Sequence, residues 1–312
     1  MHPALSVIAF TTASGAGYGL LAFLGLLAPL GWLPGSTGFA VLATGLALAA
    51  IAGGLLSSTL HLGHPERAWR ALSQWRSSWL SREGLAAVLT FVPAGLFAAA
   101  WVFGGVASTV LGLLAAAGAV ATVHCTAMIY ASLKPVQRWH NGWVAPNYLA
   151  MAAMTGALWL HLLCRLFAFP APAVALLAVI ATAVALALKL GYWRFIDTTA
   201  SASTPESATG LGRIGKVRLL EAPHTSENYL LEEMGFRIAR KHAAKLRAIA
   251  LVAGFAVPLL LALVALLSDG LAGALAATLA APIATAGVLV ERWLFFAEAR
   301  HTVMLYYGAR AA

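Results

Sequence analysis

Cysteine is scarce in this chain, and its two cysteines, Cys125 and Cys164, both lie inside long apolar runs. A disulfide framework is built from several paired cysteines, and an iron–sulfur cluster usually takes four cysteine ligands. The sequence therefore argues against a disulfide-stabilised domain and excludes an iron–sulfur cluster held by this chain alone. Any cluster that exchanges electrons with it would have to belong to another polypeptide.

Charge is scarce as well. Charged residues make up 10% of the chain and hydrophobic residues 61%, and the mean hydropathy is +0.84, which excludes an ordinary soluble domain. Most of the apolar stretches are long enough to cross a hydrocarbon core of about 30 Å. The stretches are 4–30, 38–60, 84–103, 106–131, 148–168, 171–190, 248–267 and 272–297. We expect an all-α protein, a polytopic bundle of eight transmembrane helices that forms a single domain over residues 1–312.

Positive charge is distributed unequally between the two sides of these spans. Nineteen of the 20 Lys and Arg residues fall in alternate connections, and only Arg165 lies on the opposite side. The basic connections are 61–83, 132–147, 189–247 and 292–312. Because Lys and Arg are retained on the cytoplasmic side, we expect both termini and every large loop to be cytoplasmic. This bias explains the net charge of +9 through contact with anionic lipid rather than with nucleic acid.

The loop 191–247 is the one large element expected outside the membrane. Residues 226–247 have a helical pattern, with Glu residues early and Lys and Arg residues late, which suits the helix dipole. Such a helix could lie on anionic lipid, or the loop could be a docking element for a cytoplasmic subunit. A transporter is a weaker interpretation, because no inverted repeat is visible and ionisable residues gather at one interface.

The connection between the second and third spans has the strongest functional pattern. His61 ends one span and Glu83 begins the next, so a helical hairpin would bring both to the same membrane depth. Ionisable groups there are uncommon and often functional. A quinone site needs a hydrogen-bonding partner for the headgroup and a titratable exit for protons, and these two residues would supply them. His64 and Arg67 would shape the local potential. A purely structural alternative is an interfacial belt of Trp and Arg residues.

Two other histidines predict a different cofactor. His124 and His161 lie in the fourth and fifth spans, which are neighbours in a hairpin. We expect both to lie about 15–20 Å from the cytoplasmic ends of their helices at 1.5 Å per residue. Two imidazoles at one depth could ligate a b-type haem, although interhelical hydrogen bonding is a simpler explanation. Glu291 and Arg292, near the inner end of the last span, are expected to form an ion pair, with a role for Glu291 in proton transfer as an alternative.

Several long segments resemble the membrane-anchor subunit of the dimethyl sulfoxide reductase class of molybdopterin oxidoreductases. They are MHPALSVIAFTTASGAGYGLLAFLGL, LHLGHPERAW, SREG, CTAMIYASLKPVQRWHNGW, APHTSENYLLEEMGFRIARKHA and ERWLFFAEA. The resemblance implies an eight-helix anchor without haem in the bacterial inner membrane, with quinone or quinol as its only redox partner in the membrane. It also implies that a molybdopterin catalytic subunit and an iron–sulfur subunit carry the other cofactors. In that family, residues matching His61 and Glu83 are implicated at the quinone site.

The position of the large loop suggests which branch of the family the chain resembles. Some anchors of this family hold their catalytic partners on the outer face, whereas the charge distribution here places the proposed site and the loop on the cytoplasmic face. The long basic insertion before the seventh span resembles the branch associated with cytoplasmic sulfite oxidation. We therefore expect sulfite oxidation with quinone as acceptor, ahead of reduction of an S-oxide or N-oxide by quinol. The anchor alone would not act on the terminal substrate.

Overall fold

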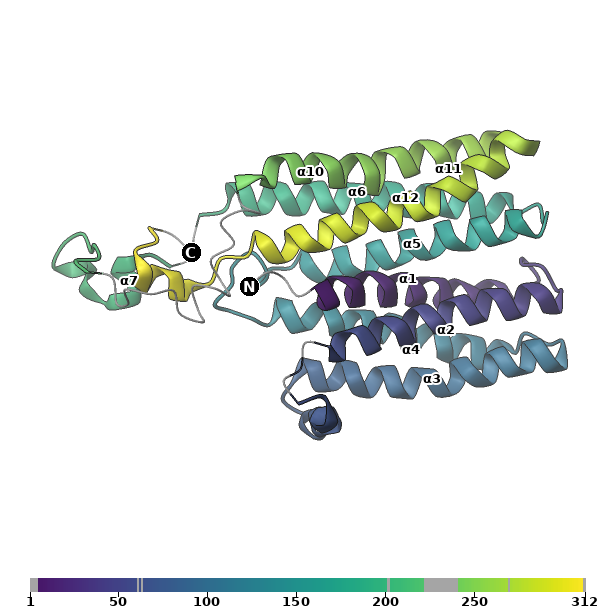
Figure 1. The fold of residues 1–312 in the computed structure, drawn as a ribbon, viewed down its shortest axis with the longest axis horizontal. Helices are drawn as coiled ribbons and strands as arrows, with labels where there is room; N and C mark the ends of the chain where they lie inside the picture. Colours follow the sequence, from purple (N-terminus) through teal and green to yellow (C-terminus); the bar gives the residue numbers. More distant parts are fainter. Residues whose placement is uncertain are drawn as a thin grey trace.

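The computed structural model describes residues 5–60, 62, 64–200, 203–221, 241–268 and 270–310, and it shows helices and no strands over these ranges. Eight spans long and apolar enough to cross a membrane run side by side along the long axis (Figure 1). Six are single helices before the large loop: α1 (Leu5–Leu27), α2 (Thr37–Thr59), α3 (Trp79–Gly104), α4 (Thr109–Ala131), α5 (Val144–Leu166) and α6 (Pro172–Thr198). The seventh joins α10 (Ala243–Leu251), η3 (Val252–Ala256) and α11 (Val257–Leu267), and the eighth is α12 (Gly270–Ala297). The predicted all-α fold is confirmed.

Two helix boundaries differ from the predicted ones in a way that affects the site. Helix α3 begins at Trp79, so Glu83 lies within the helix rather than in its first turn. Helix α6 continues to Thr198, eight residues past the predicted end at 190, so Lys189 lies well inside the helix rather than at the junction of span and loop. Hydropathy underestimates the length of both helices, because their terminal turns contain polar and charged residues.

The seventh span changes its winding before a proline. Residues Val252–Ala256 form a π-helical segment, and Pro258 follows in the first turn of α11. Proline lacks an N–H, and its ring clashes with the carbonyl four residues earlier, here that of Gly254. A π-helical turn shifts this carbonyl, so the span continues through the proline without a break.

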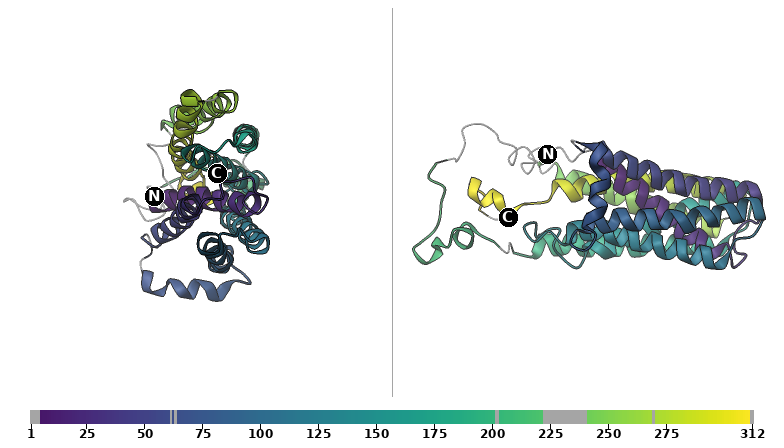
Figure 2. Two further views of the ribbon diagram at one scale, coloured as in Figure 1. Left: turned by 90° about the vertical axis from the view of Figure 1, so that its right-hand side faces the viewer. Right: turned by 90° about the horizontal axis from the view of Figure 1, so that it is seen from below.

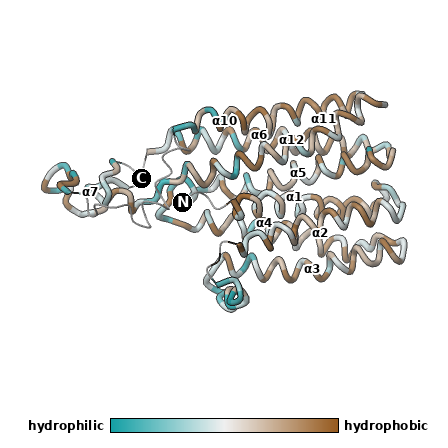
Figure 3. The backbone as a smooth tube through the Cα atoms, viewed as in Figure 1, coloured by the Kyte–Doolittle hydropathy of each residue, from teal (hydrophilic) through white to brown (hydrophobic). Residues whose placement is uncertain are grey.

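The two ends of the bundle are different. The short-loop end holds the connections 28–36, 105–108 and 167–171 and the end of α11. The long-loop end holds the start of α1 and the last described residues of the chain (Figure 1). The long-loop end also carries the shorter elements η1 (Pro65–Gln74), α7 (Pro205–Thr209), η2 (Leu211–Arg213) and η4 (Thr302–Tyr307). Hydrophilic residues are concentrated at this end, and the spans are predominantly hydrophobic (Figure 3).

Helix α1 occupies the centre of the bundle, where it contacts α2, α4, α5 and α12. Close approach depends on glycines that face each other. Gly19 packs against Gly156 of α5, and Gly25 packs against Gly112 of α4, with no room for a Cβ at any of these positions. In a bilayer, helices associate through close packing rather than through the hydrophobic effect, so these contacts hold the centre together.

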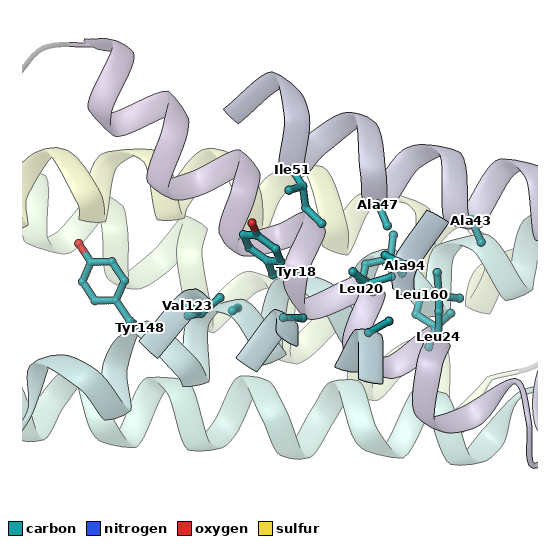
Figure 4. Packing of buried hydrophobic residues seen from close by; sticks show 14 of the residues in the cluster. Tyr18, Leu20, Leu24, Ala43, Ala47, Ile51, Ala94, Val123, Tyr148 and Leu160 are labelled. Carbon is teal, nitrogen blue, oxygen red and sulfur yellow. The ribbon is translucent and has the colours of Figure 1, made fainter. Parts of the chain in front are cut away.

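The core on either side of α1 is built from small and medium-sized apolar side chains. Figure 4 shows Ile51 and Ala47 of α2 directed towards Tyr18 and Leu20 of α1, all of them buried. The outer faces instead expose large apolar side chains, such as Phe103 at 89%. Large apolar groups on the outside and small ones inside are typical of a protein whose surrounding solvent is lipid.

Candidate functional site

Glu83 is a buried carboxylate near the long-loop end of the bundle. It lies on α3, whose N-terminus is capped by Ser78 through the backbone N–H of Ser81. Its exposed fraction is 4%, and the Thr126 hydroxyl of α4 donates a hydrogen bond to Glu83 Oε1. A carboxylate held by a neighbouring helix at this depth is costly unless it has a partner. Thr126 therefore orients Glu83 while leaving its second oxygen available.

The element η1 covers the first turns of α3 beside Glu83. The Ser81 hydroxyl donates to the backbone carbonyl of Ala71 in η1, and a Cβ built on Gly84 would lie 3.0 Å from Cδ2 of Leu72. Arg82 supports the end of the same connection, with Nε donating to the Trp75 carbonyl at 2.9 Å. The connection is therefore an ordered cover on α3 rather than a free loop.

The predicted site residues of this connection lie in two settings. His61 lies outside the described residues. His64 and Arg67 are exposed and both approach Glu66: His64 Nδ1 is 3.0 Å from Glu66 Oε1, and Arg67 Nε is 3.8 Å from the same oxygen. These side chains form a solvated cluster rather than contacting Glu83. A surface ion pair of this kind contributes about 0–1 kcal/mol.

The Trp residues of the connection form cation–π pairs with Arg neighbours, as an interfacial belt would. Trp69 pairs with Arg70 at 5.6 Å between ring centroid and Cζ, and Trp79 pairs with Arg82 at 4.3 Å. The axis of η1 runs across the bundle axis at the edge of the molecule (Figure 2). This orientation suits an element lying in the membrane–water interface.

The two histidines of the haem interpretation are not brought together. His124 is exposed on the outer face of α4, where it meets the Trp79 ring edge-on at 6.2 Å. It precedes the end of α4 by about 10 Å at 1.5 Å per residue, whereas His161 lies about 25 Å beyond the start of the antiparallel α5. His161 is buried near the short-loop end, and Arg165 Nε donates to it at 3.4 Å. The expectation of equal depth was wrong because His124 is close to the end of α4, and because α5 begins at Val144, before the predicted start at 148, which places His161 deeper.

A buried charge cluster lies on the other side of the bundle, and its Lys189 was not predicted. Glu291 of α12 forms an ion pair with Lys189 of α6, and its other oxygen lies 3.4 Å from Arg292 Nε. The three side chains are at most 3% exposed. The Arg292 guanidinium also stacks on the Tyr148 ring, with Cζ 3.7 Å from the centroid. The predicted proximity of Glu291 and Arg292 is confirmed. Lys189 was missed because it was counted with the basic residues of the following connection, at the predicted end of its span.

A narrow polar cavity separates Glu83 from this cluster. It lies between α1, α4, α5 and α12, and its free volume of about 10 Å³ admits roughly one water molecule. Its polar lining comes from Thr11, Thr12, Ser14, Thr126, Tyr148, Thr155 and Arg292. Thr126 therefore contacts Glu83 and also lines the cavity. The cavity as it stands is too small for a six-membered ring.

A second polar network joins three elements at the long-loop end. Arg247 of α10 binds Asp197 of α6 through Nη1 at 2.6 Å and Glu298 through Nε at 2.8 Å. In the connection between α4 and α5, burial lowers the pKa of the Arg138 guanidinium below its ordinary value, against the opposing effect of Glu298. These contacts fix the two ends of the large loop relative to the bundle.

Comparison with known proteins decides the family. A model of the DMSO reductase anchor subunit matches residues 1–308. This chain belongs to that family. It is also 36% identical to a sulfite dehydrogenase subunit of Allochromatium vinosum over an alignment of 331 positions that covers all of both chains. The anchor subunit is therefore a multi-pass membrane subunit of a molybdoenzyme complex, and the complex's catalytic and iron–sulfur subunits carry its cofactors.

Proposed function

We propose that this anchor subunit exchanges electrons between the iron–sulfur subunit and the quinone pool, with Glu83 as the proton-transferring residue of the quinone site. The observation that supports this most directly is the buried Glu83 carboxylate, held by Thr126 and adjacent to the connection that follows His61. A quinone that is reduced takes up two electrons and two protons. The iron–sulfur subunit would supply the electrons, and Glu83 would pass protons from the aqueous side to a quinone oxygen.

The remaining site residues have distinct proposed roles. His61 would hydrogen-bond a quinone carbonyl or quinol hydroxyl. His64 and Arg67, which are exposed beside Glu66, would set the potential at the mouth of the site. The interfacial orientation of η1 (Figure 2) supports a route by which a lipid-dissolved quinone reaches Glu83 from the side of the bundle.

The complex is proposed to oxidise sulfite on the cytoplasmic face of the bacterial inner membrane. The similarity to a sulfite dehydrogenase subunit over the full length supports the substrate, and the excess of basic residues at the long-loop end supports the orientation. The competing function is reduction of an S-oxide or N-oxide by quinol, which membership of the DMSO reductase anchor family favours. The same site would then release protons through Glu83. Assays of the assembled complex with sulfite and with dimethyl sulfoxide distinguish electron flow into the quinone pool from electron flow out of it.

The quinone half-reaction is tested with His61→Ala and Glu83→Gln in the assembled complex. His61→Ala should abolish quinone-coupled turnover, because the headgroup loses its hydrogen-bonding partner. Glu83→Gln keeps the shape and the bond from Thr126 but removes the titratable proton, so turnover should fall at least about 100-fold, with a smaller change in KM. Activity with a soluble dye, which bypasses the membrane site, should persist in both variants.

The matched control is Glu66→Gln, which removes an exposed carboxylate from the same connection and should leave turnover close to the wild-type value. Wild-type quinone-coupled rates in both site variants, with the complex fully assembled, would show that the quinone reacts elsewhere.

A further inference from the structure

The cavity between α1, α4, α5 and α12 has polar atoms that the surrounding helices do not satisfy. The Thr12 and Tyr148 hydroxyl oxygens have no hydrogen-bond partner among the residues that the structure describes. Both side chains are at most 4% exposed and both line the cavity. Buried polar atoms usually have a partner, and an orphaned one costs about 1–3 kcal/mol. A polar cavity with room for about one water and several hydroxyls around it meets the requirements for an ordered water.

A second cavity continues the polar region on the far side of Arg292. It is lined by Asn147, Lys189, Tyr192 and Glu291, and Tyr148 and Arg292 line both cavities. Here the Asn147 side-chain oxygen is without a hydrogen-bond partner in the described part of the chain, and Glu291 Oε2 has only its ion pair with Arg292 Nε. The Tyr192 hydroxyl donates to the Arg138 carbonyl at 3.0 Å, in the connection between α4 and α5 at the long-loop end. The polar region therefore extends from Thr126 to an aqueous surface of the protein.

The charges of the region are not balanced. Lys189 and Arg292 carry two positive charges, and Glu291 carries one negative charge, so the cluster has a net charge of +1 if all three are ionised. A buried net charge is costly, and water in the two cavities would reduce this cost by solvating the cluster. Across the first cavity, the Glu83 carboxylate is reached through Thr126.

We propose that ordered water in these two cavities forms a proton route between Glu83 and the aqueous surface at Arg138. The Thr12 hydroxyl and the Glu291 carboxylate relay the proton between waters, and Arg292, which stays protonated, only binds the water. This proposal rests on the proposed quinone function. For each quinone reduced, two electrons come from the iron–sulfur subunit and two protons from bulk water. The route delivers protons to the Glu83 carboxylate, which passes them to the quinone oxygen, so that Glu83 is reprotonated from inside the bundle while η1 covers its other side.

Thr12→Val tests the route with little change in shape. Valine removes a hydroxyl that lines the cavity and bonds no other described residue, so water in the cavity loses one of its hydrogen-bond partners. Quinone-coupled turnover, measured per dye-active complex at saturating quinone, should fall about tenfold with an unchanged KM. The solvent deuterium isotope effect on turnover should rise, because proton delivery becomes slower than electron delivery. Thr12→Ser keeps the hydroxyl and should restore both values.

The matched control is Thr44→Val on α2. Thr44 is also buried, but its hydroxyl donates to the Ala40 carbonyl of its own helix, and it does not line either cavity. This variant should keep the wild-type rate and isotope effect. Wild-type turnover in Thr12→Val, or an equal loss in Thr44→Val, would refute the route. If quinone-coupled turnover is slow in Glu83→Gln but normal in Thr12→Val, the proposed quinone site is supported and the proton route is refuted. Normal turnover in Glu83→Gln would refute both the quinone site and the proton route.

Discussion

Glu291 lies between two cations, and this position makes it the most sensitive of the three buried charges. Lys189 and Arg292 both approach its carboxylate, and Glu291 and Lys189 are at most 2% exposed. If Lys189 or Arg292 is replaced by a neutral residue, one cation and the Glu291 carboxylate remain as a balanced pair. If Glu291 is replaced by a neutral residue, two buried cations remain beside each other. Breaking a buried pair so that a charge is uncompensated costs about 3–5 kcal/mol.

We therefore predict that Glu291→Gln destabilises the anchor by about 3 kcal/mol or more, whereas Lys189→Met costs clearly less. The measurement is the thermal unfolding of the purified anchor in detergent, followed by circular dichroism. Glu66→Gln, which removes an exposed carboxylate, is the control and should leave the melting temperature unchanged. Equal destabilisation by the Glu291 and Lys189 variants would contradict the charge argument.

At the scale of single residues, the sequence indicates which ionisable residues are important, but it predicts their contacts less well. Glu83 could be found because an acidic residue at the beginning of an apolar span is rare. Its partner Thr126 could not, because threonines within helices commonly bond their own backbone carbonyls. His161 was placed at the wrong depth because α5 begins at Val144, before the predicted start at 148. Lys189 shows the same limit: it was predicted at the boundary of its span, and the longer helix α6 places it in the core.

At the scale of elements, the crossing of α1 and α5 shows what hydropathy cannot provide. The glycines of the first two spans indicate close packing, but they do not have the same role. Gly19 faces the backbone of Ala152 and Gly156, whereas a Cβ added to Gly53 of α2 would meet no atom within 4 Å. Which face of each helix meets a neighbour depends on rotation about its axis, and mean hydropathy carries no information about that rotation. The spans could be predicted, and their contacts could not.

Gly19→Ala is predicted to destabilise the anchor by about 2 kcal/mol or more, because the added methyl group overlaps the Ala152 carbonyl and neither backbone can move without separating the helices. Gly53→Ala makes the same chemical change where there is open space, so it should be neutral or slightly stabilising through its higher helix propensity. The two variants are compared by the temperature at which the detergent-solubilised protein loses its helical signal. A Gly19→Ala protein as stable as Gly53→Ala would show that the crossing is looser than described.

At the scale of the whole molecule, the two ends of the bundle differ because only the long-loop end carries an arm. We use this name for residues 203–221 together with 302–308. The two segments are joined by a hydrogen bond from the Tyr306 hydroxyl to the Ala208 carbonyl at 3.0 Å. The arm extends beyond the helix ends along the bundle axis (Figures 1 and 2). Lipid therefore does not cover it. The predicted helical segment 226–247 lies mostly outside the described residues, so the choice between lipid contact and docking depends on the arm.

Ile214 and Leu220 of the arm are 85% and 90% exposed, and Arg213, Lys216 and Arg218 lie near them in the sequence. Large apolar side chains that are exposed to water outside the membrane indicate a surface that binds another protein. Because the chain is the anchor of a complex with an iron–sulfur subunit, we propose that this subunit docks on the arm. Electron transfer requires it to sit close to the quinone site, and the arm and η1 lie at the same end of the bundle (Figure 2).

The double variant Ile214→Ser, Leu220→Ser should release the soluble subunits. A few central side chains supply most of the binding energy of a protein interface, so their replacement removes most of it. We expect dye-linked activity to move from washed membranes to the soluble fraction by a factor of about 10 or more, corresponding to a loss of about 1.4 kcal/mol or more in binding. The anchor itself should stay in the membrane. Leu30→Ser is the control, because Leu30 is 62% exposed at the opposite end of the bundle. If the double variant kept its soluble subunits as firmly as Leu30→Ser does, the docking surface would have to be sought on η1 and the connection between α4 and α5 instead.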